Sequence, residues 1–444
     1  MMIRVIVAAL IVFCALPCPA QQDKAGLPIK NISNAGLKEL VDVALQNNPS
    51  VASRKALVAA TAARVGMAKA MTRPQVSTST FGTLNNMPMV FPGPDAVEPR
   101  NFSLTADKPR LDQNVMAMFP VYTGGSLSGR INSAQSLKDA ASCDAVTVEL
   151  DTALAVKNAY YQTLLVQKYV DAYQKRVDEA TERARIAESA YAEGRIARYD
   201  LLRNQTDLAE ARQQLNNSQR DVEMALIDLK NMMGISQSSQ LTVTQELAAP
   251  AAPPSLDELQ ATAIKQRPEI QAARARARSA QSNIAVAKSA YKPQVYGTAM
   301  ADLSVMKGDS VNGATDTGYL VGIAAALPIF DGGLRKSSVD EANAMLLQMQ
   351  ADERDALLAV SKEVAASYTQ FTAASKNADL AQPAIAQSEE DYRVIRMRYE
   401  AGKATNVEVL DSLAALTRAR TMYAEALYQQ NVAREQITRA IGER

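Results

Sequence analysis

The chain has 444 residues, of which 47% are hydrophobic and 21% charged, and its formal net charge is +1. This balance allows a large buried core and excludes a polyelectrolyte, so the composition indicates no nucleic-acid partner. The sequence contains no histidine, which removes the commonest general base and the commonest transition-metal ligand. We therefore expect no enzyme activity, no cofactor and no metal site.

The first twenty residues read MMIRVIVAALIVFCALPCPA, with Arg4 followed by an apolar run and a small-residue ending at Ala20. This pattern predicts a secretory signal peptide cleaved after Ala20. Cys18 follows a proline, whereas a lipid-anchor site needs a small residue there, so lipidation of Cys18 is the less favoured alternative. The mature part contains no run of 18 apolar residues, so the exported chain is either soluble or a β-barrel.

The rest of the sequence is an internal duplication. Four motifs recur in the same order in both halves: LKELVDVALQNNPSV and LDELQATAIKQRPEI, AKAMTRPQV and AKSAYKPQV, FPVYTGG and LPIFDGG, and YAEG and YEAG. The first two pairs are offset by 219 residues and the last two by 208, so the first copy carries 11 extra residues, in a proline-rich stretch that we expect to be an exposed loop. We expect a first structural repeat over residues 21–247, a proline-rich linker over residues 248–254 and a second repeat over residues 255–444.

Each repeat is expected to begin with a helical run, which Pro49 divides in the first copy and Pro268 in the second. Two extended segments follow, and the predicted strands lie near residues 74–84 and 113–122 in the first repeat and near residues 293–303 and 319–330 in the second. Long helices complete each repeat. No proline lies between Gly125 and Gly194, which allows a helix of about 100 Å with the apolar spacing typical of a coiled coil.

The extended segments have the length of about 9–11 residues that a tilted membrane-spanning β-strand needs. Four strands cannot close a barrel of useful width, and an open sheet cannot lie in lipid with unpaired edges. Several chains are therefore expected to contribute strands to one barrel. The same strands are also compatible with a small soluble sheet, which stays open as an alternative.

The segment YEAGKATNVEVLD places a glycine between two helical runs. Gly402 and its counterpart Gly194 are expected to end their helices, because glycine takes the left-handed conformation at little cost. Thr405 and Glu408 form the pattern of a capping box at the start of the next helix. Asp411 lies three residues further on, so Glu408 and Asp411 share a helix face.

Together, the doubled motifs resemble those of the TolC-like outer membrane efflux proteins over essentially the whole mature chain. The resemblance implies a mainly α-helical fold with a transmembrane β-barrel portion. In this fold a homotrimer builds a twelve-stranded barrel in the outer membrane, and the barrel continues into a periplasmic α-barrel of long coiled-coil helices. It also implies a passive outer membrane channel of a tripartite efflux or type I secretion system. The implied partners are outer membrane lipid, a periplasmic adaptor protein and an inner-membrane pump of the RND, MFS or ABC type.

The resemblance also assigns roles to residues at the periplasmic tip. It implies that Glu408 and Asp411 line the pore constriction, although Glu408 has the capping box as an equally weighted alternative. It further implies that Tyr399 and Asp200 form a gating link and that the turns at Gly194 and Gly402 dock the adaptor. The family's arginine two residues after the second glycine is replaced by Ala404, which leaves a second gating link without its donor.

One alternative of a different class is a soluble periplasmic coiled-coil scaffold. Fractionation with the outer membrane separates it from the channel. The sequence does not identify the transported substrate or the particular pump and adaptor, and it leaves efflux and protein secretion both open.

Overall fold

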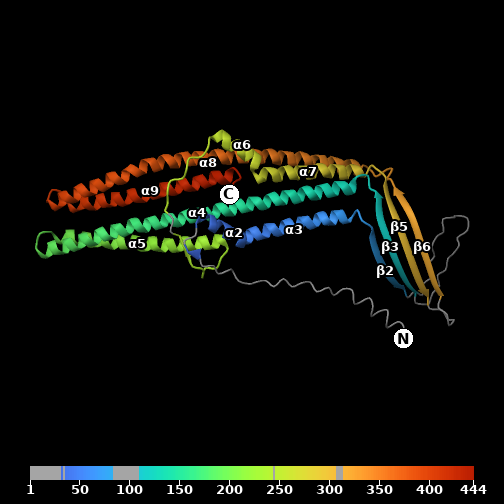
Figure 1. Ribbon diagram of the computed structural model, residues 1–444, viewed down its shortest axis with the longest axis horizontal. Coiled ribbons are helices and arrows are strands. Elements are labelled where there is room, and N and C mark those ends of the chain that lie inside the picture. The colour runs from blue at the N-terminus through green and yellow to red at the C-terminus, as the bar shows by residue number, and fades with distance from the viewer. Residues whose placement is uncertain (1–31, 34–35, 84–109, 244–245, 307–313) are drawn as a thin grey trace, which may run out of the picture.

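The structure is a computed structural model that describes residues 32–33, 36–83, 110–243, 246–306 and 314–444. The predicted signal peptide with Cys18, and the loop that carries the extra residues of the first copy, lie outside these ranges. The described part is long and narrow, with a sheet at one end and two helical hairpins at the other (Figure 1).

The same elements recur in the same order in both halves of the chain. The first half contains α2 (Leu37–Asn47), α3 (Pro49–Ala70), β2 (Gln75–Thr83), β3 (Arg110–Tyr122), α4 (Ser126–Ala192) and α5 (Arg198–Met233). The second half contains α6 (Leu256–Gln266), α7 (Pro268–Ser289), β5 (Gln294–Met306), β6 (Ala314–Ala326), α8 (Leu334–Glu400) and α9 (Asn406–Ala440). The long helices α4 and α8 have 67 residues each, so the proline-free run of the first half is one continuous helix.

The four long strands form one antiparallel sheet in the order β2-β3-β5-β6. Within the described residues, β2 and β6 each pair on one side only. Asp112 pairs with Ser304 and Asn114 with Asp302, which places these polar residues on one face of the sheet. The other face carries apolar side chains: Leu111, Val115, Leu303, Val321 and Ile323.

The last predicted strand ends earlier than the sequence indicates. β6 stops at Ala326, so residues 327–330 lie outside it, because Pro328 has no N–H to donate and no described strand pairs with the outer edge. Arg335 holds this segment by donating to the carbonyl oxygens of Pro328 at 2.7 Å and Ile329 at 3.2 Å. In the first copy β3 continues to Tyr122, with a register shift after Pro120, because β5 pairs with it there.

The helices next to the sheet follow the order of the strands: α3 contacts α4, α4 contacts α7, and α7 contacts α8. Beyond the middle of the molecule the layer consists of two antiparallel hairpins, α4–α5 and α8–α9, which meet where α4 contacts α9 (Figure 1). None of the helices described carries an apolar stretch long enough to cross a membrane.

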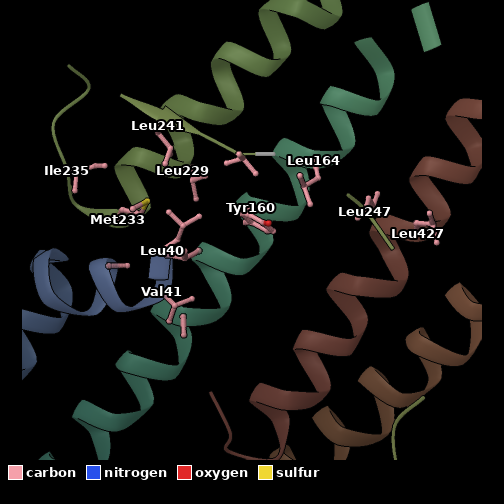
Figure 2. Packing of buried hydrophobic residues seen from close by; sticks show 14 of the residues in the cluster. Leu40, Val41, Tyr160, Leu164, Leu229, Met233, Ile235, Leu241, Leu247 and Leu427 are labelled. Atoms are coloured by element: carbon pink, nitrogen blue, oxygen red, sulfur yellow. The ribbon is translucent and has the colours of Figure 1, made fainter. Parts of the chain in front are cut away.

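The largest core lies halfway along the molecule, where short elements wrap the long helices. Here α2, α4, α5 and α9 meet the segment that follows α5, which forms the two-residue strand β4 (Leu241–Thr242) parallel to β1 (Ile32–Ser33). Figure 2 shows its large buried side chains, which include Leu40, Tyr160, Leu229, Met233 and Leu427. Away from this belt many buried positions of α4 are alanine. The buried side chains of α4 toward its tip are therefore small, whereas a separate apolar cluster of Tyr392, Val409, Leu413 and Leu416 packs α8 against α9 near the second tip.

Candidate functional site: the hairpin tips

Both hairpins turn at a glycine in the left-handed region. Gly194 has φ of 71° and Gly402 has φ of 69°. The N–H of Arg195 donates to the carbonyl of Ala190 at 2.8 Å, and the N–H of Lys403 donates to that of Arg398 at 2.7 Å. These are the long hydrogen bonds of a Schellman motif, which satisfies the last carbonyls of a helix. Gly194 and Gly402 therefore end α4 and α8, and their role in docking an adaptor stays a prediction.

The helix after the second turn begins with a complete capping box. The Oγ1 of Thr405 accepts from the N–H of Glu408 at 3.3 Å, and Oε2 of Glu408 accepts from the N–H of Thr405 at 2.6 Å. These hydrogen bonds to the ionised form hold the pKa of Glu408 below its ordinary value, the backbone N–H having the largest effect. Glu408 and Asp411 are both exposed one turn apart. Glu408 is thus a helix cap, while its role with Asp411 in a pore constriction stays a prediction.

Tyr399 and Asp200 interact electrostatically across the two repeats. Burial raises the pKa of Tyr399, and the negative charge of Asp200 raises it further, against the opposing charge of Arg183. No direct hydrogen bond between Tyr399 and Asp200 occurs among the contacts of the described residues. The structure thus brings the two predicted residues together electrostatically, and their function as a gating link stays a prediction.

A second contact between the hairpins was not predicted from the sequence. The hydroxyl of Tyr392, on α8, donates to Oε2 of Glu179, on α4, at 2.8 Å, and Arg396 lies 3.9 Å from the same oxygen. Burial, followed by the hydrogen bond to Glu179, raises the pKa of Tyr392 to about 12, so the phenol stays a donor at neutral pH. One signal was available, because Tyr392 precedes Tyr399 by seven residues and therefore shares its helix face. Nothing in the sequence marks Glu179.

A small cavity of about 60 Å³ lies between the hairpins beside these contacts. Its lining includes Glu179, Arg183, Tyr399 and Asn406. Asn406 is 7% exposed, and its amide nitrogen has no hydrogen-bond partner in the structure. A cavity of this size has room for ordered water that could satisfy such a donor. The seam between the two hairpins therefore contains polar groups near the tips, beside the apolar lining from Ile186, Ala187 and Val409.

Ala404 lies in the second turn, between Gly402 and the cap at Thr405. Its methyl group offers no donor, so this position contributes no polar link between the hairpins. The hydrogen bond and the ion pair described here come instead from Glu179 on α4 and from Tyr392 and Arg396 on α8, before their turns.

Comparisons with known proteins agree with this architecture. The sequence profile of the outer membrane efflux protein family matches residues 40–235 and 259–443, which cover both repeats. The chain is 26% identical over 321 residues to the pyoverdine export outer membrane protein OpmQ of Pseudomonas aeruginosa. The aligned residues cover 71% of this chain and 65% of that protein. It is 25% identical over 418 residues to protein CyaE of Bordetella pertussis, covering 91% and 82% of the two chains.

Solved structures show the same fold. The outer membrane protein VceC of Vibrio cholerae superposes with a TM-score of 0.74 at 18% identity, over 92% of this chain and 96% of that one. The outer-membrane channel OprN superposes with a TM-score of 0.77 at 19% identity, over 92% and 90%. With both repeats matched in sequence and the whole architecture matched in space, the chain belongs to the outer membrane efflux protein family.

Proposed function

We propose that this outer membrane efflux protein is a passive exit duct, built from three copies and opened at its periplasmic tips by an adaptor and an inner-membrane pump. The duct performs no chemistry. The alternative of a soluble periplasmic scaffold does not fit membership of this family.

The observation that carries the proposal concerns the two sides of a single chain. On each side an edge strand of the sheet and an outer helix of the helical layer are free to contact another copy. In the described part of the chain, β2 and β6 each pair with a strand on one side only, and α3 and α8 are the outer helices of the layer on the same two sides. The apolar face that includes Val321 and Ile323 is exposed, at 79% and 76%. Additional copies pair the edges and turn this apolar face toward lipid, with the polar face that carries Asp112 and Asp302 inside.

The tips supply the other end of the duct. Three copies place three Glu408 and three Asp411 side chains around one axis, and rings of carboxylates favour cations in a pore. Glu408 can take part while it caps α9, because its hydrogen bonds to Thr405 use Oε2.

The relatives' printed names point to different cargoes. One is a pyoverdine export protein and another a cobalt-zinc-cadmium resistance protein of Cupriavidus metallidurans. A duct shared by such systems needs a wet, weakly binding wall, so the proposal names the partners by class and leaves the cargo unassigned.

The test is conductance of the purified protein in planar lipid bilayers, together with its molecular mass in detergent. We expect the protein to be a trimer that forms cation-selective channels. We also expect the double variant Glu408→Ala with Asp411→Ala to be less cation-selective. Glu210→Ala, an exposed acid on α5, is the matched control. Absence of channels from a membrane-inserted protein would contradict the duct, and unchanged selectivity would contradict the acidic ring.

A further inference from the structure

Positive charge gathers where the strands of the sheet meet the helices. Three observed pairs place the helical ends of all four strands at one edge of the sheet: Gln75 with Met118, Val295 with Tyr122, and Gln294 with Ala326. Neighbouring strands lie about 4.8 Å apart, so the four connections fall within about 15 Å. We call this region the sheet–helix junction, and it comprises residues 66–76, 118–132, 284–298 and 326–339.

The junction is basic although the chain as a whole is nearly neutral. The chain has 48 Lys and Arg against 47 Asp and Glu, whereas the junction has seven Lys and Arg against one acid, Asp331. This acid is already engaged, because its carboxylate lies 2.6 Å from Nε of Arg335 and accepts from the N–H of Gly333 at 3.1 Å. In the part of the chain that the structure describes, none of the other six cations forms an ion pair.

Three of the seven cations have a structural role. Lys69 and Lys288 lie in the last turns of α3 and α7, where a cation stabilises the negative end of a helix. Arg335 pairs with Asp331, and its guanidinium lies 4.9 Å from the centre of the Tyr291 ring. The fold itself therefore accounts for these three.

The fold does not account for the other four, which we call the junction cations: Arg73, Arg130, Lys292 and Lys336. All four are exposed. Lys336 is the third residue of α8 and Arg130 the fifth of α4, close to helix N-termini, whose partial positive charge repels cations. Neither helix has an acid in its first turn, whereas α5 and α9, which begin at the tips, have Asp200 and Glu408 there. An anion from outside the chain would offset this repulsion.

The surroundings of the junction cations point to a phospholipid as the source of that anion. The same segments expose large apolar side chains, with Val121 at 56%, Ile329 at 93% and Phe330 at 89%. Tyr122 and Tyr291 are about half exposed. Apolar side chains, tyrosine rings and cations side by side are typical of a membrane–water boundary, where acyl chains give way to headgroups. A soluble anion needs no apolar neighbours.

We propose that the sheet–helix junction binds the headgroups of anionic phospholipids through the junction cations. The partner is the membrane leaflet on the helical side of the sheet, so the inference rests on the membrane-spanning sheet of the proposed duct. Lys292 is well placed for this contact. A Cβ added to Gly124 would lie 2.8 Å from Cβ of Lys292, so the stem of the lysine is packed while its exposed end can reach a phosphate.

Native mass spectrometry of the purified protein in detergent tests the class of lipid. Phosphatidylglycerol, which is anionic, and phosphatidylcholine, which is zwitterionic, are added in separate titrations at equal concentrations. Each cation near an anionic surface contributes roughly fivefold in affinity. We therefore expect phosphatidylglycerol to bind at least about tenfold more tightly than phosphatidylcholine.

Two lysines of the junction provide the variants. Lys292→Gln with Lys336→Gln should lower the preference for phosphatidylglycerol by about tenfold or more and leave the binding of phosphatidylcholine unchanged. Lys175→Gln with Lys403→Gln is the matched control, because it removes the same charge from exposed positions on the helical hairpins. Lys336→Arg keeps the charge and should keep the preference.

Equal affinity of the wild-type protein for the two lipids would overturn the inference. An equal loss in the control variant would overturn it as well, because net charge alone would then set the preference. Displacement of phosphatidylglycerol by an equal concentration of inorganic phosphate would exclude the phospholipid as the specific partner. Each of these results leaves the proposed duct intact if the protein still forms channels in planar bilayers, whereas a protein that does not insert would contradict the duct itself.

Discussion

The two hairpin tips have the same backbone but use the same acidic position differently. Ala197 and Thr405 are the N-cap residues of α5 and α9, and Asp200 and Glu408 follow each by three. Thr405 has a hydroxyl and closes a capping box with Glu408, whereas Ala197 makes no side-chain cap. The acid of the second tip is thus committed to its own helix, and that of the first acts on Tyr399 across the repeats.

The next position on the same face differs in charge. Asp411 in the second tip corresponds to Arg203 in the first, where Nη1 of Arg203 donates to the hydroxyl of Tyr199 at 2.7 Å. An acidic pair therefore forms in one tip of each chain only. The two turns are therefore equivalent in their backbone, and only the second carries two acids on this helix face.

The junctions at the belt show a second difference between the repeats. The side chain of Asn48 donates to the carbonyl of Met232 near the end of α5 at 2.9 Å. Arg267, at the matching position, donates to the carbonyl of Arg439 near the end of α9 at 2.9 Å. It also contacts Glu363 at 2.6 Å. Both junctions close the end of a long helix, one with a neutral amide and the other with a charged network.

The largest expected effect tests that difference. The side chain of Arg267 is 3% exposed, so Arg267→Ala removes a buried charge and a cap from the same site. We expect a loss of about 3 kcal/mol, the lower end for a broken buried pair, because Glu363 is 38% exposed. Asn48→Ala should cost about 1 kcal/mol, as an N-cap does. Urea unfolding in detergent measures both, and equal losses would remove the contrast between the junctions.

The next effect concerns the link between the tips. Glu179→Ala and Tyr392→Phe remove the hydrogen bond that joins α4 to α8. If this hydrogen bond stabilises the closed state, its removal should destabilise that state by about 1 kcal/mol. The fraction of time that the channel is open should then rise roughly fivefold in single-channel recordings. Glu390→Gln is the control, because Glu390 pairs with Arg393 on its own helix. A change of the same size in the control would assign the effect to helix stability.

Much of this contrast lies beyond what the sequence predicts. The repeats, the long helices and the glycine turns follow from local patterns, because proline, glycine and apolar spacing act on the chain nearby. The contacts of Glu179 and Arg267 do not follow from local patterns, because the partner of each residue lies far away in the sequence. The end of β6 at Ala326 could not be predicted either, because the length of a strand depends on which strand lies beside it.

An effect of similar size should follow from making the first tip like the second. Ala197→Thr places a hydroxyl at an N-cap whose backbone is already extended, with φ of −75° and ψ of 153°. We expect α5 to gain about 1 kcal/mol through a hydrogen bond from the N–H of Asp200. Slower amide hydrogen exchange in the first turn of α5 measures it. Unchanged exchange would mean that the tips differ for a reason other than the cap.

The smallest effect is a pH dependence confined to the second tip. Because the folded pKa of Glu408 lies below its ordinary value of 4.5, the cap contributes fully above that value and is lost as the pH falls through the folded pKa. The protection factors of the amides in the first turn of α9, which are corrected for the intrinsic exchange rate at each pH, should therefore fall at low pH more than those in the first turn of α5. Glu408→Gln keeps an acceptor but cannot titrate, so it should abolish this difference. If the difference persisted, a titrating group other than Glu408 would control this turn.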